Sequence, residues 1–300
     1  MKPWIPRSVQ LSLRRNIVRI KRKKYRDKWP IDERAATPPP EWSGWPDGKR
    51  FALVLTHDVD TERGAERCHV LANLEESFGF RSSFNFVPER YTVVPELRHA
   101  LVARGFEVGV HGLYHDGKYF DSPEIFRERA VKINRYIKEW NAVGFRTPSM
   151  LHKLEWMSAL DILYDASTFD TDPFEPQSDG MGTIFPFLVE AEKPNRGFVE
   201  LPYTLPQDFT LFILMKEKTI DIWKKKLDWI AEKGGMALLN THPDYMNFGD
   251  GKMGKEECPA EYYATFLEYI RTIYGEMCWH ALPRELASWW MTRTKSAGIA

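Results

Sequence analysis

From Phe51 onward, short apolar runs alternate with longer segments in which apolar residues recur every three or four positions. The short runs are bounded by turn residues and are typical of buried strands, whereas the longer spacing is typical of amphipathic helices. The predicted strands are 51–57, 81–87, 105–111, 142–147, 162–168, 198–203 and 236–242. The predicted helices are 62–78, 95–104, 123–140, 154–161, 219–233, 260–274 and 284–293. Strand followed by helix, repeated about seven times, predicts an α/β fold with a parallel sheet, most simply a (β/α) barrel.

Polar side chains gather where the predicted strands end. Such clusters are found at 57–60, 111–115, 146–148, 165–168 and 240–243. In a (β/α) barrel the carboxyl ends of the strands lie on one face, and that face holds the active site. The sequence has no Gly-x-Gly-x-x-Gly or Walker loop, so a nucleotide-binding open sheet has no support. We therefore expect the five clusters to converge on one site.

Two carboxylates and two imidazoles in these clusters have the spacing of metal ligands. Asp58 and Asp60 are two residues apart, so an extended chain projects both to the same side, where they need a cation or a shared proton. His111 and His115 are four apart, and a helical turn would place them on one face. With Asp60 they form a His/His/Asp set that leaves open positions on a divalent metal. A strand ending in a polar loop, and histidines paired by chance, are the alternatives for each motif taken alone.

Four motifs, taken in order, resemble those of the NodB-type polysaccharide deacetylases, which form carbohydrate esterase family 4. They are Thr56-His57-Asp58-Val59-Asp60, His111-Gly112-Leu113-Tyr114-His115, Arg146-Thr147-Pro148 and Leu239-Asn240-Thr241-His242. The resemblance covers roughly residues 50–245, and the ordered set is more specific than any single motif. It implies a distorted (β/α) barrel with one divalent metal, usually zinc and sometimes cobalt or nickel. It also implies a carbohydrate substrate, an N-acetylated sugar or glycan from which an acetyl group is removed.

The same resemblance implies a role for each matching residue. The implied metal ligands are Asp60, His111 and His115. Asp58 is implied as the general base that deprotonates the attacking water, with Arg146 beside it to keep it ionised. His242 is implied as the general acid that protonates the leaving amine. An acidic residue should orient that histidine, and we expect Asp165 in this role, with Asp170 as the second choice.

The first motif departs from the pattern of the family. There the two aspartates are usually adjacent and follow a Phe, whereas here His57 precedes Asp58 and Val59 separates the pair. This Asp-x-Asp form resembles an atypical branch, and it leaves open hydrolysis of a cyclic amide or ureide on the same fold. A second alternative, of a different class, is a glycan-binding relative without turnover. The complete set of base, metal ligands and acid argues against the second alternative.

Residues 1–30 form a strongly basic arm, with eleven Lys or Arg and one acidic residue, a net charge of +10. Of the 42 basic and 42 acidic residues in the chain, the remainder holds 31 and 41, a net of −10. Val9, Leu13, Ile17 and Ile20 follow helical spacing, so the arm is predicted to form a short amphipathic helix. Two interpretations are equally open. Either residues 1–30 bind an anionic membrane surface, or the helix packs on the acidic domain.

Pro38-Pro39-Pro40 closes the arm and sets the predicted domain boundary, with residues 1–41 as the arm and 42–300 as the barrel domain. No apolar stretch typical of a secretory signal follows the basic residues, and no segment reaches the length of a membrane span. The three cysteines have no Cys-x-x-Cys spacing, which argues against a disulfide scaffold. We expect a cytoplasmic protein, peripheral at the membrane if the arm binds there, with no nucleic-acid partner.

Overall fold

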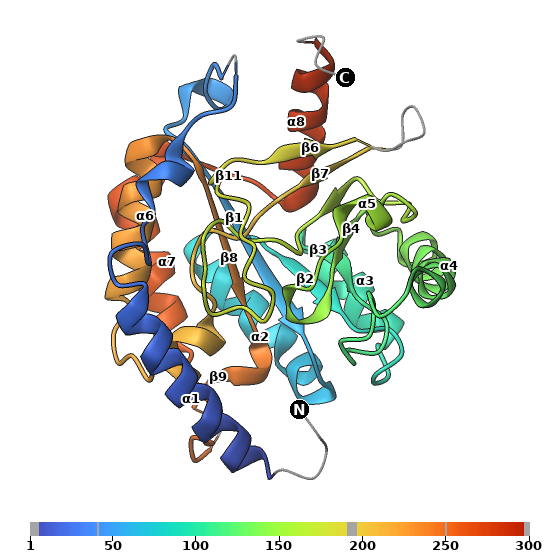
Figure 1. Ribbon diagram of the computed structural model, residues 1–300, viewed down its shortest axis with the longest axis horizontal. Helices are drawn as coiled ribbons and strands as arrows, with labels where there is room; N and C mark the ends of the chain where they lie inside the picture. The colour runs from blue at the N-terminus through green and yellow to red at the C-terminus, as the bar shows by residue number, and fades with distance from the viewer. Residues whose placement is uncertain (1–5, 41, 191–196, 250, 297–300) are drawn as a thin grey trace.

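Strand β1 (Phe51–Val59) lies inside the sheet, and all nine of its residues are buried. The computed structural model describes residues 6–40, 42–190, 197–249 and 251–296 (Figure 1). β1 pairs on one side with β8 (Met236–Thr241), and on the other with β11 (Cys278–His280) and β2 (Ser83–Phe86). All three pairings are parallel. A parallel strand that is covered on both faces usually has a continuous run of apolar residues, and residues 51–55 form such a run.

The remaining strands curl the sheet into an incomplete barrel. After β2 they follow in the order β3 (Glu107–His111), β4 (Gly144–Arg146), β5 (Tyr164–Asp165), β7 (Phe198–Glu200) and β6 (Phe187–Val189). Only the pairing of β6 with β7 is antiparallel among the described strands of this sheet. On the far side, a single parallel bridge between Leu205 and Leu239 joins the segment after β7 to β8. The predicted α/β fold with a distorted (β/α) barrel is therefore confirmed.

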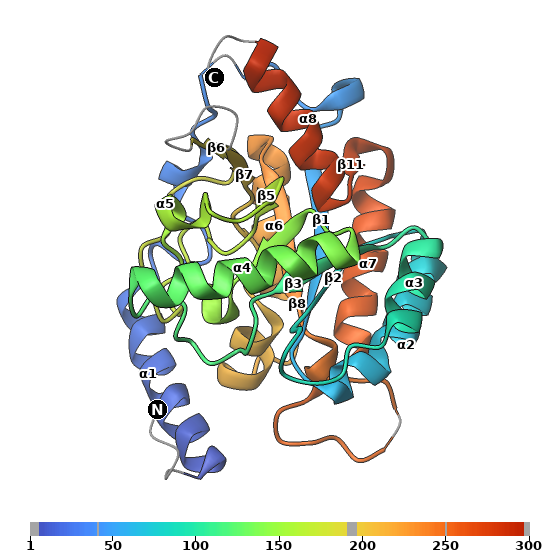
Figure 2. The ribbon, with the colours of Figure 1, turned by 90° about the vertical axis from the view of Figure 1, so that its right-hand side faces the viewer.

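Helices cover the outside of the curled sheet (Figure 1 and Figure 2). They are α2 (Glu62–Phe78), α3 (Pro95–Ala103), α4 (Pro123–Trp140), α5 (Leu154–Met157), α6 (Asp221–Lys233), α7 (Glu261–Tyr274) and α8 (Pro283–Ser296). In α4, the Ser122 side chain caps the first turn by accepting a hydrogen bond from the Ile125 N–H, and Asn141 ends the helix in the left-handed conformation. Its buried face has helical spacing: Phe126, Ala130, Ile133 and Ile137. That face packs inward, which is why the segment folds as an amphipathic helix.

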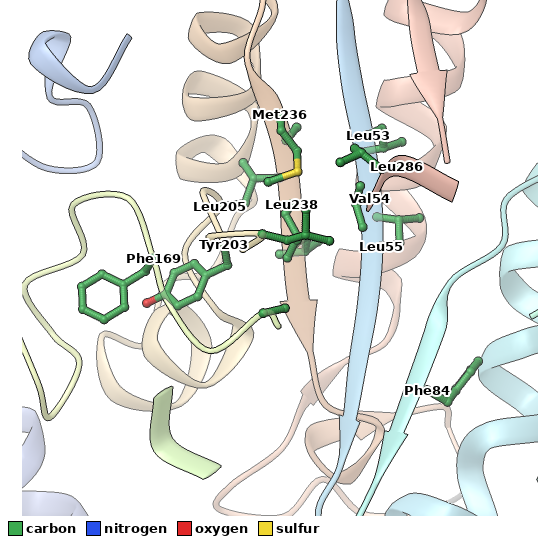
Figure 3. Close-up of a cluster of buried hydrophobic side chains, with 14 of the residues drawn as sticks. Leu53, Val54, Leu55, Phe84, Phe169, Tyr203, Leu205, Met236, Leu238 and Leu286 are labelled. Atoms are coloured by element: carbon green, nitrogen blue, oxygen red, sulfur yellow. The ribbon is translucent and has the colours of Figure 1, made fainter. Parts of the chain in front are cut away.

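The hydrophobic core lies between the strands and the helices around them. Figure 3 shows a buried cluster with side chains from β1, β8, the segment after β7 and α8. Its labelled members include Leu53, Leu55, Leu205, Met236, Leu238 and Leu286. All six are at most 1% exposed, so the amino-terminal part of β1 is fixed by packing. The carboxyl end of the same strand is buried too, but with polar side chains, and it is there that the site forms.

Some predicted elements are shorter in the structure, and others have no predicted counterpart. The predicted strand 162–168 is reduced to β5, and the predicted helix 154–161 to α5. β6, β11 and a π-helical segment (Phe209–Leu214) match no predicted element. β6 and β11 contain three residues each, so pairing with a neighbouring strand, and not a local pattern, makes them strands.

The basic arm folds back onto the body. Helix α1 (Arg7–Lys24) buries Leu11 and Val18 and lies beside the π-helical segment, where Arg15 Nε donates to the Ile213 carbonyl at 3.0 Å. Two ion pairs also tie the helix to the body: Arg7 with Glu256, and Arg22 with Glu217. This is the packing that the second interpretation of the arm predicts. None of the described helices, α1 included, is long and apolar enough to cross a membrane.

Candidate metal and catalytic site

Asp60, His111 and His115 converge at the carboxyl ends of β1 and β3. The Asp60 Oδ1 lies 3.3 Å from His111 Nε2 and 3.1 Å from His115 Nε2, and the ligand atoms of all three lie within 4.8 Å of one another. The two histidines do not share a helix, contrary to the expected helical turn. His111 ends β3, and the chain then bends through Gly112 and brings His115 back in a left-handed conformation with φ 57°.

The donor atoms of this cluster fit a divalent cation. His111 Nδ1 lies 3.1 Å from the Arg146 carbonyl oxygen, which can only accept, so a ring hydrogen belongs on Nδ1, and the nitrogen that a metal would use is Nε2. Asp60 Oδ1 is buried and has no hydrogen-bond partner within the part of the chain that the structure describes. A cation bound between the Asp60 Oδ1 and the His111 Nε2, which lie 3.3 Å apart, would contact both atoms. Two imidazoles and one carboxylate are ligands that zinc favours.

Asp58 is held by side chains from three other strands of the sheet. Asn85 of β2 and Arg146 of β4 each donate to its Oδ1 at 3.1 Å, and Asn240 of β8 donates to its Oδ2 at 2.8 Å. Burial opposes the charge of this carboxylate, but the nearby Arg146, His111 and His242 together outweigh burial, and the pKa of Asp58 falls to about 2. The Oδ2 also lies 3.8 Å from His111 Nε2, so Asp58 is an ionised carboxylate beside the cluster.

Arg146 is fully buried and fixed along its length. Its Nε donates to the Ala166 carbonyl at 2.7 Å, and its Nη1 also donates to Thr56 at 2.9 Å and to Asn240 Oδ1 at 2.7 Å. These contacts leave the guanidinium one orientation, in which it faces Asp58. The predicted pairing of Arg146 with Asp58 is present in the structure.

The carboxylate that contacts His242 is Asp208. The prediction that Asp165 orients this histidine is wrong. Asp208 accepts the His242 backbone N–H through Oδ2 and contacts the imidazole Nδ1 through Oδ1, both at 2.7 Å. Asp165 instead accepts from the Ser167 hydroxyl at 2.7 Å. The second choice, Asp170, is bound by the Lys226 ammonium. Both side chains are committed elsewhere, which is why neither reaches the histidine.

Asp208 determines the charge of His242. Burial lowers the pKa of this imidazole, but the charge of Asp208 and its hydrogen bond, together with the charges of Asp60 and Asp58, outweigh burial and raise the pKa to about 10. His242 is therefore protonated at neutral pH. Because Nδ1 is engaged by Asp208, Nε2–H is the proton that remains free to be donated.

These groups line one cleft with a volume of about 750 Å³. Asp58, Asp60, His111, His115 and His242 all contribute to its wall. Aromatic side chains line it as well: Phe174, Phe209 and Tyr245. α1 forms a further part of the wall through one row of side chains: Arg7, Gln10 and Arg14. Four of the five predicted polar clusters thus contribute to the site, while the Asp165 side chain does not line the cleft.

The sequence patterns assigned no individual role to several residues that support the site. Asn85, Gln207, Asp208 and Asp244 are all buried beside it. Asp244 accepts the Asp60 backbone N–H at 3.0 Å, and Gln207 accepts from Asn240 at 3.2 Å. One signal was available for two of them, because Gln207-Asp208 follows the predicted strand 198–203, whose end had no polar cluster assigned. For Asn85, in mid-strand, no such signal exists.

Comparisons with known proteins identify the fold. No protein-family model matches the chain, and no curated protein matches it in sequence. Similar solved structures include a protein assigned as a polysaccharide deacetylase from Mycobacterium smegmatis, with 19% identity over 86% of this chain and 96% of that chain, TM-score 0.65. Another, assigned likewise, from Pseudomonas aeruginosa PAO1, has 17% identity over 87% and 98%, TM-score 0.61. This is the fold of the NodB-type deacetylases.

An allantoinase shares the NodB-type fold, with 16% identity over 88% of this chain and 98% of that chain and a TM-score of 0.64. At such identities the similarity to NodB-type deacetylases concerns the fold alone, because one fold hosts different reactions. The reaction has to be argued from the residues that line the cleft.

Proposed function

We propose that this protein is a metal-dependent hydrolase that removes an acetyl group from an N-acetylated sugar or glycan. One observation carries the proposal: an ionised carboxylate, a protonated imidazole and a His/His/Asp cluster line the same cleft. Hydrolysis of an amide needs an acceptor for the proton of water, a donor for the leaving nitrogen and a stabiliser of the oxyanion. The cleft offers candidates for all three.

Asp60, His111 and His115 would hold the metal, for which we propose zinc, and the same donors accept cobalt or nickel. When bound, such an ion polarises a carbonyl oxygen and makes a water molecule more acidic. The ring hydrogen on His111 Nδ1, donated to the Arg146 carbonyl, keeps Nε2 aimed at the ligand position.

Asp58 would accept the proton of the attacking water. Its Oδ2 is the oxygen that faces the cluster, and its low pKa keeps it ionised at neutral pH. Three hydrogen bonds from Asn85, Arg146 and Asn240 hold the carboxylate in one orientation, so it needs no rearrangement during the reaction.

His242 would donate a proton to the leaving nitrogen. Its Nε2–H is free, and Asp208 stabilises the imidazolium in the resting protein. After His242 has given up its Nε2 proton, Asp58 holds the proton taken from water. Asp58 is then neutral and His242 is neutral, so both differ from the resting protein by one proton. The next turnover requires both changes to be reversed.

The walls of the cleft suit a sugar ring. Phe174, Phe209 and Tyr245 line the cleft, and aromatic side chains offer apolar surface that can pack against the apolar face of a sugar. Glu175 and Gln207, which also line the cleft, can accept hydrogen bonds from hydroxyl groups. The combination of aromatic faces and polar acceptors supports a carbohydrate substrate.

Acetate release from N-acetylated chitooligosaccharides by the zinc-loaded protein tests the proposal. We expect release that is lost on chelation, restored by zinc, and reduced by Asp58→Asn. Asp228→Asn on α6, which removes a carboxylate bonded to Tyr269 and Tyr274, is the matched control and should keep activity. Ring opening of allantoin without acetate release would favour the cyclic-amide alternative, and glycan binding without product would favour a binding relative.

We also propose that residues 42–300 form the hydrolase domain, with residues 1–41 as an accessory arm that completes the cleft wall. The three cysteines are buried thiols. Such thiols suit a reducing compartment, which supports the cytoplasm as the location.

A further inference from the structure

Helix α1 exposes an apolar stripe on the side that faces away from the body. Leu11 and Val18, which contact the body, are 3% and 5% exposed. The outward stripe is formed by four other residues: Val9 (45% exposed), Leu13 (46%), Ile17 (53%) and Ile20 (69%). At 100° per residue these four lie within one quarter of the helix circumference. No other described helix has more than one large exposed apolar side chain, so the stripe is a distinct feature.

Packing against the body does not require the outward stripe. The contacts that hold α1 in place come from other positions on the helix. Arg7 and Arg22 pair with carboxylates of the body, and Arg15 and Lys21 donate to backbone carbonyls at 3.0 and 2.6 Å. Figure 1 shows α1 along the outer edge of the molecule, where nothing covers its far side among the described residues. An exposed apolar row of this length indicates a surface that something else covers.

Basic side chains border the outward stripe. Arg19, Lys23 and Lys24, here called the flanking cations, are exposed and lie one, three and four positions from Ile20. Within the described chain, Arg19 and Lys23 have no carboxylate partner, and Lys24 lies only over the Tyr25 ring, at 5.4 Å. Arg7 and Arg22 are neutralised by carboxylates of the body, whereas the outward cations remain available. Since the chain outside residues 1–30 has a net charge of −10, an anionic surface would attract this face and repel the others.

We propose that α1 docks the protein on an anionic lipid bilayer, with the outward stripe at the level of the acyl chains and the flanking cations among the headgroups. An exposed row of apolar side chains with cations on its borders is typical of a helix that lies in the plane of a membrane interface. The negative surface of a bilayer complements the flanking cations in a way that an uncharged partner would not.

This docking would bring the cleft to the membrane surface. Another face of the same helix contributes Arg7, Gln10 and Arg14 to the cleft wall, so the membrane-bound face and the cleft are separated only by the width of α1. If the proposed function holds, the substrates within reach include N-acetylated glycans carried on lipids. That consequence rests on the proposed function, whereas membrane binding itself does not.

Co-sedimentation of the full chain with lipid vesicles tests the proposal. We expect the protein to pellet with phosphatidylglycerol-containing vesicles at low salt, and to remain in solution with phosphatidylcholine alone. Changing all four stripe residues to Gln, which keeps helix propensity, should lower the partition coefficient roughly tenfold or more. The control variant carries Val70→Gln, Val102→Gln, Val131→Gln and Ile273→Gln, four equally exposed positions on other helices, and should bind as the unaltered protein does.

A second variant tests the flanking cations and leaves the outward stripe unchanged. Changing the three flanking cations to Gln should weaken binding by roughly fivefold for each charge and remove most of its salt dependence. The proposal is overturned if the unaltered protein ignores anionic vesicles, or if both variants bind them normally. It is also overturned if light scattering shows a dimer that the stripe variant dissociates while vesicles are not bound, because the stripe would then be an interface between two copies. All of these readouts are independent of catalytic activity.

Discussion

Replacing Asp208 by Asn should remove the charge that keeps His242 protonated. The carboxylate contacts both the imidazole Nδ1 and the backbone N–H of His242 at 2.7 Å, and it is the largest favourable contribution to the raised pKa. The pKa of His242 is raised from its ordinary value of 6.5 to about 10. At 1.36 kcal/mol per pKa unit, this rise corresponds to about 5 kcal/mol in favour of the imidazolium. Without the charge of Asp208, burial should bring the pKa of His242 back toward its ordinary value, although the charges of Asp60 and Asp58 still raise it.

The change has a defined effect on stability. A raised pKa in the folded state stabilises the protein fully below the unfolded value near 6.5, and this contribution is lost as the pH rises through about 10. Asp208→Asn should therefore lower the free energy of unfolding at neutral pH, and its difference from the unaltered protein should shrink toward pH 10. Urea unfolding at several pH values measures this difference.

Two assays check the effect on His242 directly. A ¹⁵N NMR titration of the histidine side chains in metal-free protein should show His242 losing its proton at a lower pH in Asp208→Asn. In the zinc-loaded protein, the alkaline limb of kcat/KM for acetate release should move the same way, with activity at about pH 8 reduced by roughly 10²-fold or more. Asp165→Asn is the matched control: it also changes a buried carboxyl, but one bonded to Ser167, and should leave the titration of His242 unchanged. A His242 that still titrates near pH 10 in Asp208→Asn would refute the reasoning.

Four further predictions concern the rest of the site. Asp58→Asn should reduce turnover by roughly 10²–10⁴-fold while calorimetry still detects zinc binding, and full activity in this variant would point to another base. His115→Ala should weaken zinc binding by more than about 100-fold in competition with a chelator, and unchanged affinity would exclude it as a ligand. Gly109→Ala would place a Cβ 2.2 Å from the Asn85 Oδ1, so urea unfolding should show a loss of about 1–3 kcal/mol. The low pKa of Asp58 stabilises the fold above its ordinary value of 3.8 and this contribution is lost toward pH 2, so Asp58→Asn should flatten the decline of stability between about pH 4 and 2.

Much of the fold follows from local sequence pattern. The apolar run 51–55 requires a strand covered on both faces, and the alternation with helical segments requires a parallel sheet. Helices such as α4 were predictable to the residue because a capping Ser and a helical apolar period coincide there. The short elements could not be predicted, because a strand of three residues such as β11 exists only through its pairing with β1.

The sequence also determined the chemical groups of the site. Asp60, His111 and His115 stand at the ends of predicted strands, and parallel strands bring their carboxyl ends to one edge whatever the details of packing. Asp58, Arg146 and His242 were identified in the same way, through position and motif. A residue that follows a strand end can be placed in the site without knowledge of the side chains around it.

Only the tertiary structure decided which side chains pair within the site. Asp165, Asp170 and Asp208 are all buried carboxyls, and although Asp208 follows a predicted strand, the local sequence does not show which of the three faces His242. Ser167 and Lys226 engage the first two, whereas the loop after β7 brings Asp208 to a histidine 34 positions later in the chain. The same holds for α1, whose side chains line the cleft although the helix precedes the barrel in sequence. Hydrogen bonds between side chains are sensitive to differences in distance of a few tenths of an ångström. The curl of the sheet and the packing of its loops set these distances, and the spacing of residues along the chain does not encode them.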